Sequence, residues 1–356
     1  MKKKQLKYYA FFGGKNSLGI VQKIENTVEA ASNIGYDAEK KFYVNRPAGL
    51  LEFIKDIIFG KEDIVILRFY DLFMPFIFPF LLLRRLKGTR LIIDVPTPRA
   101  TQLHEFQFDN KSRQHIAIRK LLNNLSWTWV LIPFHRIIQY AEESPWFSFG
   151  VKNKTVKMGN GIKINDQLVL ADRTSVSESV NLIAVATLAA WHGYDRLIKA
   201  VARLKKKQPD YPIYIKIVGE GQEANKLKEL ITIYKLDDCI VLTGALHGKE
   251  LTKAFEGMQF GVGSLGLFRI GLNEAAILKT REYMARGLCV IGAGQDPDFT
   301  EDSPYRFLVP NDESIESIAE LLLELRNKEL PSPIEIRSFA EKTLSFDAKI
   351  LKIIGK

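Results

Sequence analysis

The sequence predicts an α/β protein with two doubly wound domains in succession. The length of 356 residues exceeds what one hydrophobic core usually spans. Strand-like and helix-like patterns alternate along the chain, and the alternation stops in a polar stretch and then restarts. The composition, with 46% hydrophobic and 26% charged residues, is typical of a globular protein and excludes a disordered one.

In the first half, short apolar runs alternate with segments of helical periodicity. Gly13 and Gly14 follow the first run and predict a tight turn. The expected strands are 6–12, 38–44, 64–69, 91–95, 136–139 and 155–158, and the expected helices are 18–34, 50–59, 73–86 and 111–125.

The polar residues 165–180 have no clear period and predict a linker. We therefore expect a first domain over 1–165, a second over 175–330, and a terminal helix over 333–356 that crosses back to the first. Beyond the linker, the expected strands are 181–185, 214–218, 240–242, 260–263 and 288–291, and the expected helices are 194–205, 223–234, 249–256, 276–286, 314–326 and 333–354. Doubly wound sheets bind ligands at the carboxyl ends of their strands, so the active site is expected in a cleft between the domains.

The net charge of +10 is unevenly distributed. Residues 1–170 contain 26 Lys and Arg against 15 Asp and Glu, whereas residues 171–356 contain 25 against 26. This split favours an anionic partner for the first half, although a merely basic surface is the alternative. No interleaved basic and aromatic motif supports nucleic-acid binding. In Leu72–Lys87, an apolar block precedes Arg-Arg-Leu-Lys, which fits either a contact with anionic lipid or a buried helix of the first sheet.

Cysteine usage points to a reducing compartment, because Cys239 and Cys289 form no disulfide framework. The longest apolar run, Leu72–Leu83, is too short to cross a bilayer. We expect a cytoplasmic protein, with a peripheral position on the inner face of the membrane as an option. No His/Cys cluster has the spacing of a metal site, and neither a metal nor another cofactor is expected.

The segment 271–292, GLNEAAILKTREYMARGLCVIG, carries the most specific chemical signal. Glu274 and Glu282 are separated by seven residues, which on one continuous helix would place them about 12 Å apart. They could hold the two ends of an elongated ligand, such as a nucleotide sugar, with a helix start suited to phosphate between them. Lys279 and Arg281 add positive charge there. Alternatively, Lys279, Glu282 and Arg286 form a solvated salt-bridge face.

This segment resembles the hallmark of retaining GT-B glycosyltransferases related to family 4, and LKTREYMARGLCVI is similar to forms in capsular and exopolysaccharide glycosyltransferases. Residues 156–164, 181–201, 215–227 and 241–251 resemble other elements of that group in the same order. The resemblance implies a GT-B fold, with two Rossmann-like domains facing across a cleft. It also implies a metal-independent, retaining hexosyltransferase. The donor would be a nucleotide sugar, foremost a UDP-sugar, and the acceptor a hydroxyl of a lipid-linked glycan in cell-surface polysaccharide synthesis.

Carried over by position, the resemblance implies that Glu282 holds the ribose hydroxyls and that Glu274 faces the donor sugar. Leu246 is implied to lie near the base. The residues implied to hold the diphosphate are Ala275, Ala276, Ile277, Leu278 and Lys279, approached by the backbone of Gly13 and Gly14.

The sequence departs from the family where many members have an Arg and a Lys after the first strand of the second domain. Residues 191–193 read Trp-His-Gly instead, with Arg196 further on. Either His192 and Arg196 substitute for the missing cations, or Lys279 and Arg281 carry more of the phosphate charge.

The loop 94–106 borders the acceptor pocket in enzymes of this group. His104 or Glu105 could orient an acceptor hydroxyl, and Asp94 competes for that role. The alternative for His104 is an ordinary histidine in a surface loop.

Two other motifs have simpler interpretations. Residues 219–224, GEGQEA, match a dinucleotide fingerprint, but the acidic residue expected after the next strand is missing. Asp296-Pro297-Asp298 resembles a metal-binding acid pair, but a proline-containing turn is the preferred interpretation. The rival to an enzyme is a catalytically inactive module that binds a nucleotide sugar or acts as a scaffold.

Overall fold

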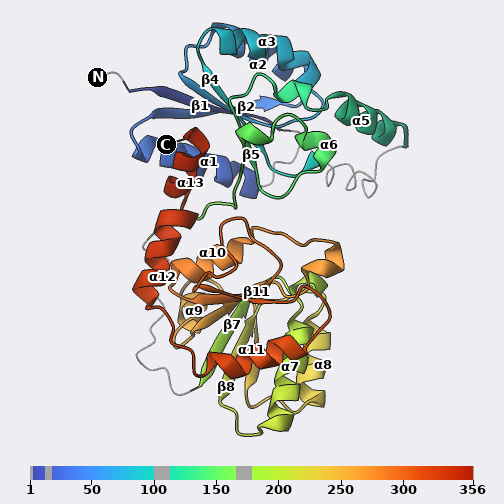
Figure 1. Ribbon diagram of the computed structural model, residues 1–356, viewed down its shortest axis with the longest axis vertical. Coiled ribbons are helices and arrows are strands. Elements are labelled where there is room, and N and C mark those ends of the chain that lie inside the picture. Colours follow the sequence, from blue (N-terminus) through green and yellow to red (C-terminus); the bar gives the residue numbers. More distant parts are fainter. Residues whose placement is uncertain (1–2, 13–17, 100–112, 166–178, 356) are drawn as a thin grey trace. The chain divides into compact units, whose positions relative to one another are not determined.

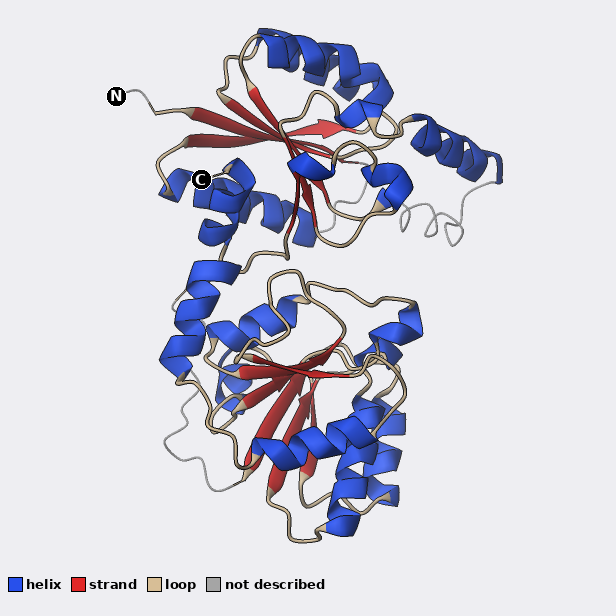
Figure 2. Cartoon of the chain, viewed as in Figure 1, coloured by secondary structure: helices blue, strands red, loops and turns tan. Residues whose placement is uncertain are grey.

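The computed structural model describes residues 3–12, 18–99, 113–165 and 179–355, which form two compact units (Figure 1). One unit comprises Met1–Gly161 with Phe346–Lys356, and the other comprises Ile162–Ser345. In each unit, helices cover both faces of a six-stranded parallel sheet (Figure 2). The predicted α/β class with two doubly wound sheets is therefore confirmed.

The sheet of the first unit has the strand order β2-β1-β3-β4-β5-β6. Side chains alternate between its faces, so that Tyr9 packs under α2 and α3 whereas Tyr8 packs under α1 and α13. The strands are β1 (Gln5–Phe12), β2 (Asp37–Val44), β3 (Ile64–Arg68), β4 (Arg90–Val95), β5 (Arg136–Gln139) and β6 (Thr155–Lys157). The helices are α1 (Leu18–Asn33), α2 (Pro47–Phe59), α3 (Met74–Leu86), α5 (Arg113–Leu125), α6 (Pro145–Ser148) and α13 (Phe346–Ile354).

The sheet of the second unit has the order β12-β11-β10-β7-β8-β9. Strands are added on one side of β7 and then on the other, so the strand order reverses between β7 and β10. The strands are β7 (Val180–Val185), β8 (Ile213–Val218), β9 (Ile240–Gly244), β10 (Phe260–Val262), β11 (Cys289–Ala293) and β12 (Arg306–Val309). The helices are α7 (Tyr194–Lys207), α8 (Ala224–Ile233), α9 (Gly248–Ala254), α10 (Leu278–Ala285), α11 (Glu316–Leu325) and α12 (Pro333–Phe339). The edge strand β12 was not predicted from the sequence.

The terminal stretch is divided, although 333–354 was expected to be one helix. α12 begins at a capping box in which the Glu335 N–H donates to Ser332 Oγ, and a wider helical turn follows over Ala340–Leu344. Ser345 is extended, with φ −67° and ψ 156°, and forms a parallel bridge with Ile162 before α13 starts. Among the described residues, no helix combines the length and the apolar character that crossing a bilayer requires.

Tyr283 fixes α10 against the sheet of the second unit. Its hydroxyl accepts a hydrogen bond from the Val185 N–H at 2.8 Å, at the end of β7. The ring lies over Gly261 of β10, where a Cβ atom would be 2.1 Å from the ring. Only glycine at position 261 lets α10 come this close to the strands.

We predict that Gly261→Ala destabilises the protein by about 1–3 kcal/mol, because the added methyl group overpacks the space of the Tyr283 ring. Urea unfolding measures the effect. The matched control is Gly19→Ala in α1, where nothing lies within 4 Å of an added Cβ. That substitution should be neutral or stabilising by up to about 1 kcal/mol. Equal unfolding midpoints for the two variants would contradict the packing described here.

Candidate functional site

The candidate site lies at the carboxyl ends of β7 and β10, where the strand order of the second sheet reverses. The loops that follow these strands meet through their backbones. Leu265 N donates to His192 O at 2.9 Å, and Gly266 N donates to Trp191 O at 3.2 Å. Gly193 has φ +64°, and a Cβ there would lie 2.8 Å from Gly266 N. Glycine is therefore required where the chain turns into α7.

The side chain of Lys279, in the first turn of α10, points to this loop junction. Its Nζ lies 2.9 Å from His192 Nδ1 and donates to Tyr194 Oη at 2.9 Å, and Ser264 Oγ is 2.9 Å from the same imidazole nitrogen. Burial lowers the pKa of Lys279 to about 7. Burial and then the charge of Lys279 lower the pKa of His192 to about 4, so the imidazole is neutral at pH 7.

Lys279 differs from its neighbour Arg281 in having no acidic partner among the described residues. Arg281 donates to Asp296 and, at 2.7 Å, to Asp298. Within the described part of the chain, no carboxylate lies at ion-pair distance from Lys279 Nζ, whose hydrogen-bond partners are neutral. A desolvated ammonium group without a counter-ion is costly, and a bound anion would remove much of that cost. This arrangement favours anion binding.

Glu274 lies in the loop before α10, and this loop is hydrogen-bonded to the residues that follow β11. It forms a parallel bridge with Gln295, and Ala275 N donates to Gln295 O at 3.0 Å. Residues 275–278 lead into α10, which begins at Leu278 rather than at the expected residue 276. The first N–H groups of a helix have no acceptor within it, so the start of α10 is a second favourable feature for an anion.

Glu282 lies in the middle of α10 and is held by Arg286. The carboxylate accepts from Arg286 Nη2 at 3.2 Å, and its side chain is 36% exposed, against 6% for Arg286. The guanidinium group also packs over the Phe255 ring, 4.4 Å from its centroid. The spacing of 282 and 286 had suggested a solvated ion pair. The pair exists, but Arg286 is buried and orients a carboxylate that remains accessible.

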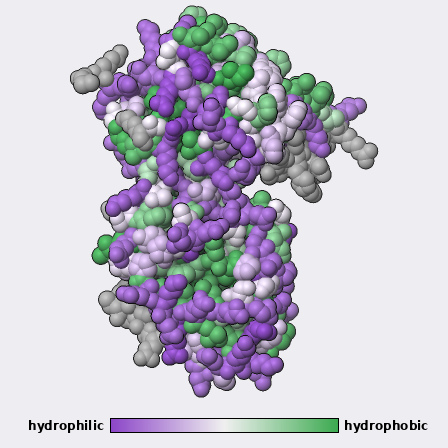
Figure 3. Space-filling model, viewed as in Figure 1, coloured by the Kyte–Doolittle hydropathy of each residue, from purple (hydrophilic) through white to green (hydrophobic). Residues whose placement is uncertain are grey.

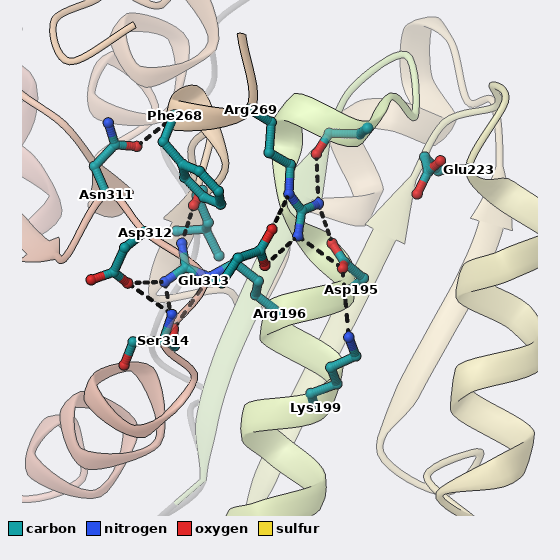
Figure 4. A network of polar contacts seen from close by, with 12 residues as sticks. Asp195, Arg196, Lys199, Glu223, Phe268, Arg269, Asn311, Asp312, Glu313 and Ser314 are labelled. Carbon is teal, nitrogen blue, oxygen red and sulfur yellow. Dashed lines mark hydrogen bonds and ion pairs between the residues drawn. The ribbon is translucent and has the colours of Figure 1, made fainter. Parts of the chain in front are cut away.

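A network of ion pairs fastens the loop before α10 to the start of α7 (Figure 4). Arg269 donates to both oxygens of Asp195, at 2.8 and 3.0 Å, and to Glu313 at 2.8 and 3.0 Å. Burial would raise the pKa of Asp195, but Arg269 holds it below the usual range. Asp195 and Glu313 are 74 and 44 positions from Arg269, so no local pattern in the sequence could indicate this network.

Arg196 and Arg281 were expected near a donor diphosphate, but both are fully buried in the structure. Arg196 donates to backbone carbonyl groups, among them that of Leu265, and lies beside Asp312 (Figure 4). Arg281 is occupied by Asp296 and Asp298, as described above. Both guanidinium groups therefore hold loops of the unit together and are not presented to a ligand. The segment 296–298 is a turn, in which Asp298 N donates to Asp296 Oδ1 at 3.1 Å.

The glycines of residues 219–224 have a packing role. A Cβ on Gly219 would lie 1.8 Å from Ala186 O, and one on Gly221 would lie 2.3 Å from Leu188 O. Glycine lets the loop after β8 pack against the loop after β7, which explains the motif without a dinucleotide. Leu246, in the loop after β9, is partly buried against the core of the unit.

Four expected site residues lie outside the described residues: Gly13, Gly14, His104 and Glu105. Asp94 is described and is buried at the end of β4, where Tyr8 Oη donates to it. Arg68 and Lys23 approach its Oδ2 at 3.3 and 3.5 Å. Burial would raise the pKa of Asp94, but Lys23 and Arg68 hold it below the usual range. A buried carboxylate of low pKa is a poor general base, so we assign Asp94 to the folding of the first unit.

The described residues contain no group of three or more His, Cys, Asp or Glu that could hold a metal ion. The site thus comprises the cation of Lys279, neutral His192, the start of α10, and the carboxylates of Glu274 before α10 and Glu282 within it. These groups can bind an elongated ligand with an anionic centre and hydroxyl groups at its ends.

The second unit is similar to a known protein family. The family described as Glycosyl transferases group 1 matches residues 179–328. A protein of Haemophilus influenzae, described as an uncharacterized glycosyltransferase, is 25% identical over 218 residues. The aligned part is 60% of this chain and spans little more than half, 57%, of that relative.

Solved structures match over both units. The apo form of the lipopolysaccharide outer core galactosyltransferase WaaB has a TM-score of 0.64 at 10% identity, with 99% of each chain covered. Anabaena Alr3699/HepE in complex with UDP has a TM-score of 0.62 at 13% identity, with 99% of this chain and 98% of that chain covered. A further structure of HepE holds UDP-glucose. At such identities the likeness shows the fold alone, and with the two parallel sheets it confirms the predicted GT-B fold class.

We predict that Lys279→Met stabilises the protein at pH 7, by about 1 kcal/mol or more, because it removes a desolvated amine. The folded-state pKa of about 7 is below the ordinary 10.5, so the unfolded chain binds the proton more readily between these values. The stability of the wild type therefore rises with pH in this window, and the advantage of Lys279→Met shrinks.

Urea unfolding at pH 7 and pH 9 measures this difference. Lys253→Met, at an exposed lysine of α9, is the control and should show no such pH-dependent gain. If Lys279→Met and the wild type respond to pH alike, the amine is not desolvated as described.

Proposed function

We propose that this chain, which carries a glycosyl transferases group 1 domain in a GT-B fold, is a glycosyltransferase whose second unit binds a nucleotide-sugar donor. The observation that carries the proposal is the amine of Lys279. It is a desolvated cation at the start of a helix, with no carboxylate at ion-pair distance among the described residues. A diphosphate supplies the negative charge that this position lacks.

In the proposed complex, the diphosphate lies against Lys279, His192 and the backbone of residues 275–278. Glu282, oriented by Arg286, accepts hydrogen bonds from the ribose hydroxyls, and Glu274 faces the sugar. Leu246 lies near the base. A UDP-sugar is the favoured donor, because HepE, which has a similar fold, is known in complex with UDP and with UDP-glucose.

The chemistry we propose is metal-independent transfer of a hexosyl group with retention of configuration. When the bond between the anomeric carbon and the phosphate oxygen breaks, negative charge develops on the leaving diphosphate. Lys279 and the start of α10 are placed to stabilise that charge, which is the largest contribution expected of the protein. Neutral His192 can keep a hydrogen bond to Lys279 without adding a charge that would compete with it.

The acceptor we propose is a hydroxyl of a lipid-linked glycan in cell-surface polysaccharide synthesis, bound by the first unit at the inner face of a membrane. The charge of that unit supports an anionic environment. Met1–Gly161 and Phe346–Lys356 together contain 28 Lys and Arg against 15 Asp and Glu.

Donor turnover tests the site directly. With a panel of nucleotide sugars and a membrane lipid extract as acceptor, Glu282→Ala should raise the KM for the donor about 10- to 100-fold, because a carboxylate hydrogen bond is lost. Glu274→Ala should lower mainly kcat. Glu229→Ala, at an exposed position of α8, is the control and should behave as wild type.

Wild-type turnover by both site variants would show that the glutamates are wrongly assigned. Nucleotide binding without turnover on any acceptor would identify a non-catalytic binding module instead.

The affinity for UDP should depend on pH through Lys279. Below its free pKa of about 7, the amine is already charged and the affinity is full. Above that pH, binding must take up a proton, so the affinity falls by up to about tenfold per pH unit until the pKa of the complex is reached. Calorimetry between pH 6 and pH 9 measures this fall.

Lys279→Arg keeps its charge and should bind UDP with little pH dependence, whereas Lys279→Met should bind weakly at every pH. A wild-type affinity that stays constant across the range would exclude Lys279 as the diphosphate ligand.

A further inference from the structure

The outward faces of α2 and α3 carry large apolar side chains that nothing in the first unit covers. The two helices pack side by side on one face of the sheet. We use the name α2/α3 surface for five residues and their exposed fractions: Leu51 69%, Phe59 72%, Phe76 57%, Leu83 54% and Leu86 76%. Figure 3 shows hydrophobic side chains at this end of the first unit, over α3.

The exposure of this surface follows from helix geometry. Met74, Ile77 and Leu81 occupy the inward stripe of α3 and are buried in the core under the sheet. Phe76 and Leu83 are seven positions apart and lie on the opposite stripe. The segment 72–87 is thus a helix buried on its inward face, as one of the two interpretations expected, while its outward face stays uncovered in the unit. A polar outward face would be sufficient for folding, so the apolar one requires another explanation.

The acidic side chains around this surface are each engaged in a contact within the unit. The contacts are Glu52 with Lys41 at 2.9 Å, Asp56 with Lys41 at 2.6 Å, Glu62 with Arg84 at 2.8 Å, and Asp63 with the backbone N of Gln5 at 2.7 Å. Each carboxylate that could oppose an anionic partner thus already has a donor.

The basic side chains at the rim remain available. Lys55, Lys61 and Lys87 are exposed, and no carboxylate of the described residues lies within ion-pair distance of them. Lys87 Nζ donates to the Ile58 carbonyl at 3.1 Å, which places its charge at the ends of the two helices. The result is an apolar centre with a rim of unneutralised positive charge.

We propose that the α2/α3 surface docks on an anionic lipid bilayer. The apolar side chains enter the boundary between headgroups and acyl chains, and the lysines contact lipid phosphates. An anionic bilayer offers acyl chains and negative charge side by side, as this surface requires. A second copy of the chain is a poor occupant, since each copy would bring the same positive rim. This proposal rests on the proposed function, because the α2/α3 surface would hold the protein near its lipid-linked acceptors.

Vesicle binding tests this proposal without any sugar transfer, so its failure is distinguishable from failure of the proposed activity. The full chain is sedimented with vesicles of phosphatidylcholine alone and of phosphatidylcholine with phosphatidylglycerol. We expect strong, salt-sensitive binding to the second kind.

Two multiple variants separate the apolar and the charged contributions. Phe59→Ser with Leu86→Ser should lower binding to anionic vesicles about tenfold or more. Lys55→Gln, Lys61→Gln and Lys87→Gln together should lower it to the level of neutral vesicles and remove the salt sensitivity. Circular dichroism and thermal unfolding confirm that both variants are folded.

Matched substitutions in the second unit serve as controls. Ile233→Ser changes a side chain that is 69% exposed on α8, and Lys206→Gln, Lys207→Gln and Lys253→Gln change three exposed lysines of α7 and α9. These controls should bind as wild type.

Three results would overturn the proposal: equal wild-type binding to both kinds of vesicle, no binding to either kind, or surface variants that bind as well as the controls. If the protein does not bind vesicles but self-associates, and Phe59→Ser with Leu86→Ser abolishes the self-association, the surface binds a second copy instead.

Discussion

The amine of Lys279 stays near the carboxyl ends of β7 and β10 with only neutral hydrogen-bond partners, and the rest of the candidate site depends on this constraint. Removing an amine from water without a counter-ion is unfavourable, so other contacts must hold it there. The Tyr283 hydroxyl ties α10 to the end of β7, and Gly261 gives its ring room. The Arg269 network fixes the preceding loop.

Carboxylates near the site form ion pairs with arginines rather than with Lys279. Asp296 and Asp298 are bound to Arg281, and Asp195 is bound to Arg269. This separation of partners leaves positive charge at the loop junction, where a diphosphate is proposed to bind. It also shows why charge alone is a poor guide: Arg281 is two positions from Lys279 but serves the fold.

The α/β pattern was predictable because strands and amphipathic helices leave a local period in the sequence. The spacing of Glu274 and Glu282 left a surface ion pair open, and the resemblance of residues 271–292 to a known family is what pointed to the candidate site. The Arg269–Asp195 pair and the burial of Arg196 were not predictable, since their partners are distant in the chain. Strand β12 was missed for a different reason, since its buried Arg306 and exposed Leu308 reverse the usual pattern of burial. The break at Ser345 was missed because one extended residue leaves no period.

A crystal structure with bound UDP tests the central claim most directly. If Lys279 is the missing half of an ion pair, a diphosphate oxygen will lie about 3 Å from its Nζ, with the ribose hydroxyls at Glu282. A diphosphate bound elsewhere, with the hydrogen bonds of Lys279 to His192 and Tyr194 unchanged, would contradict the account.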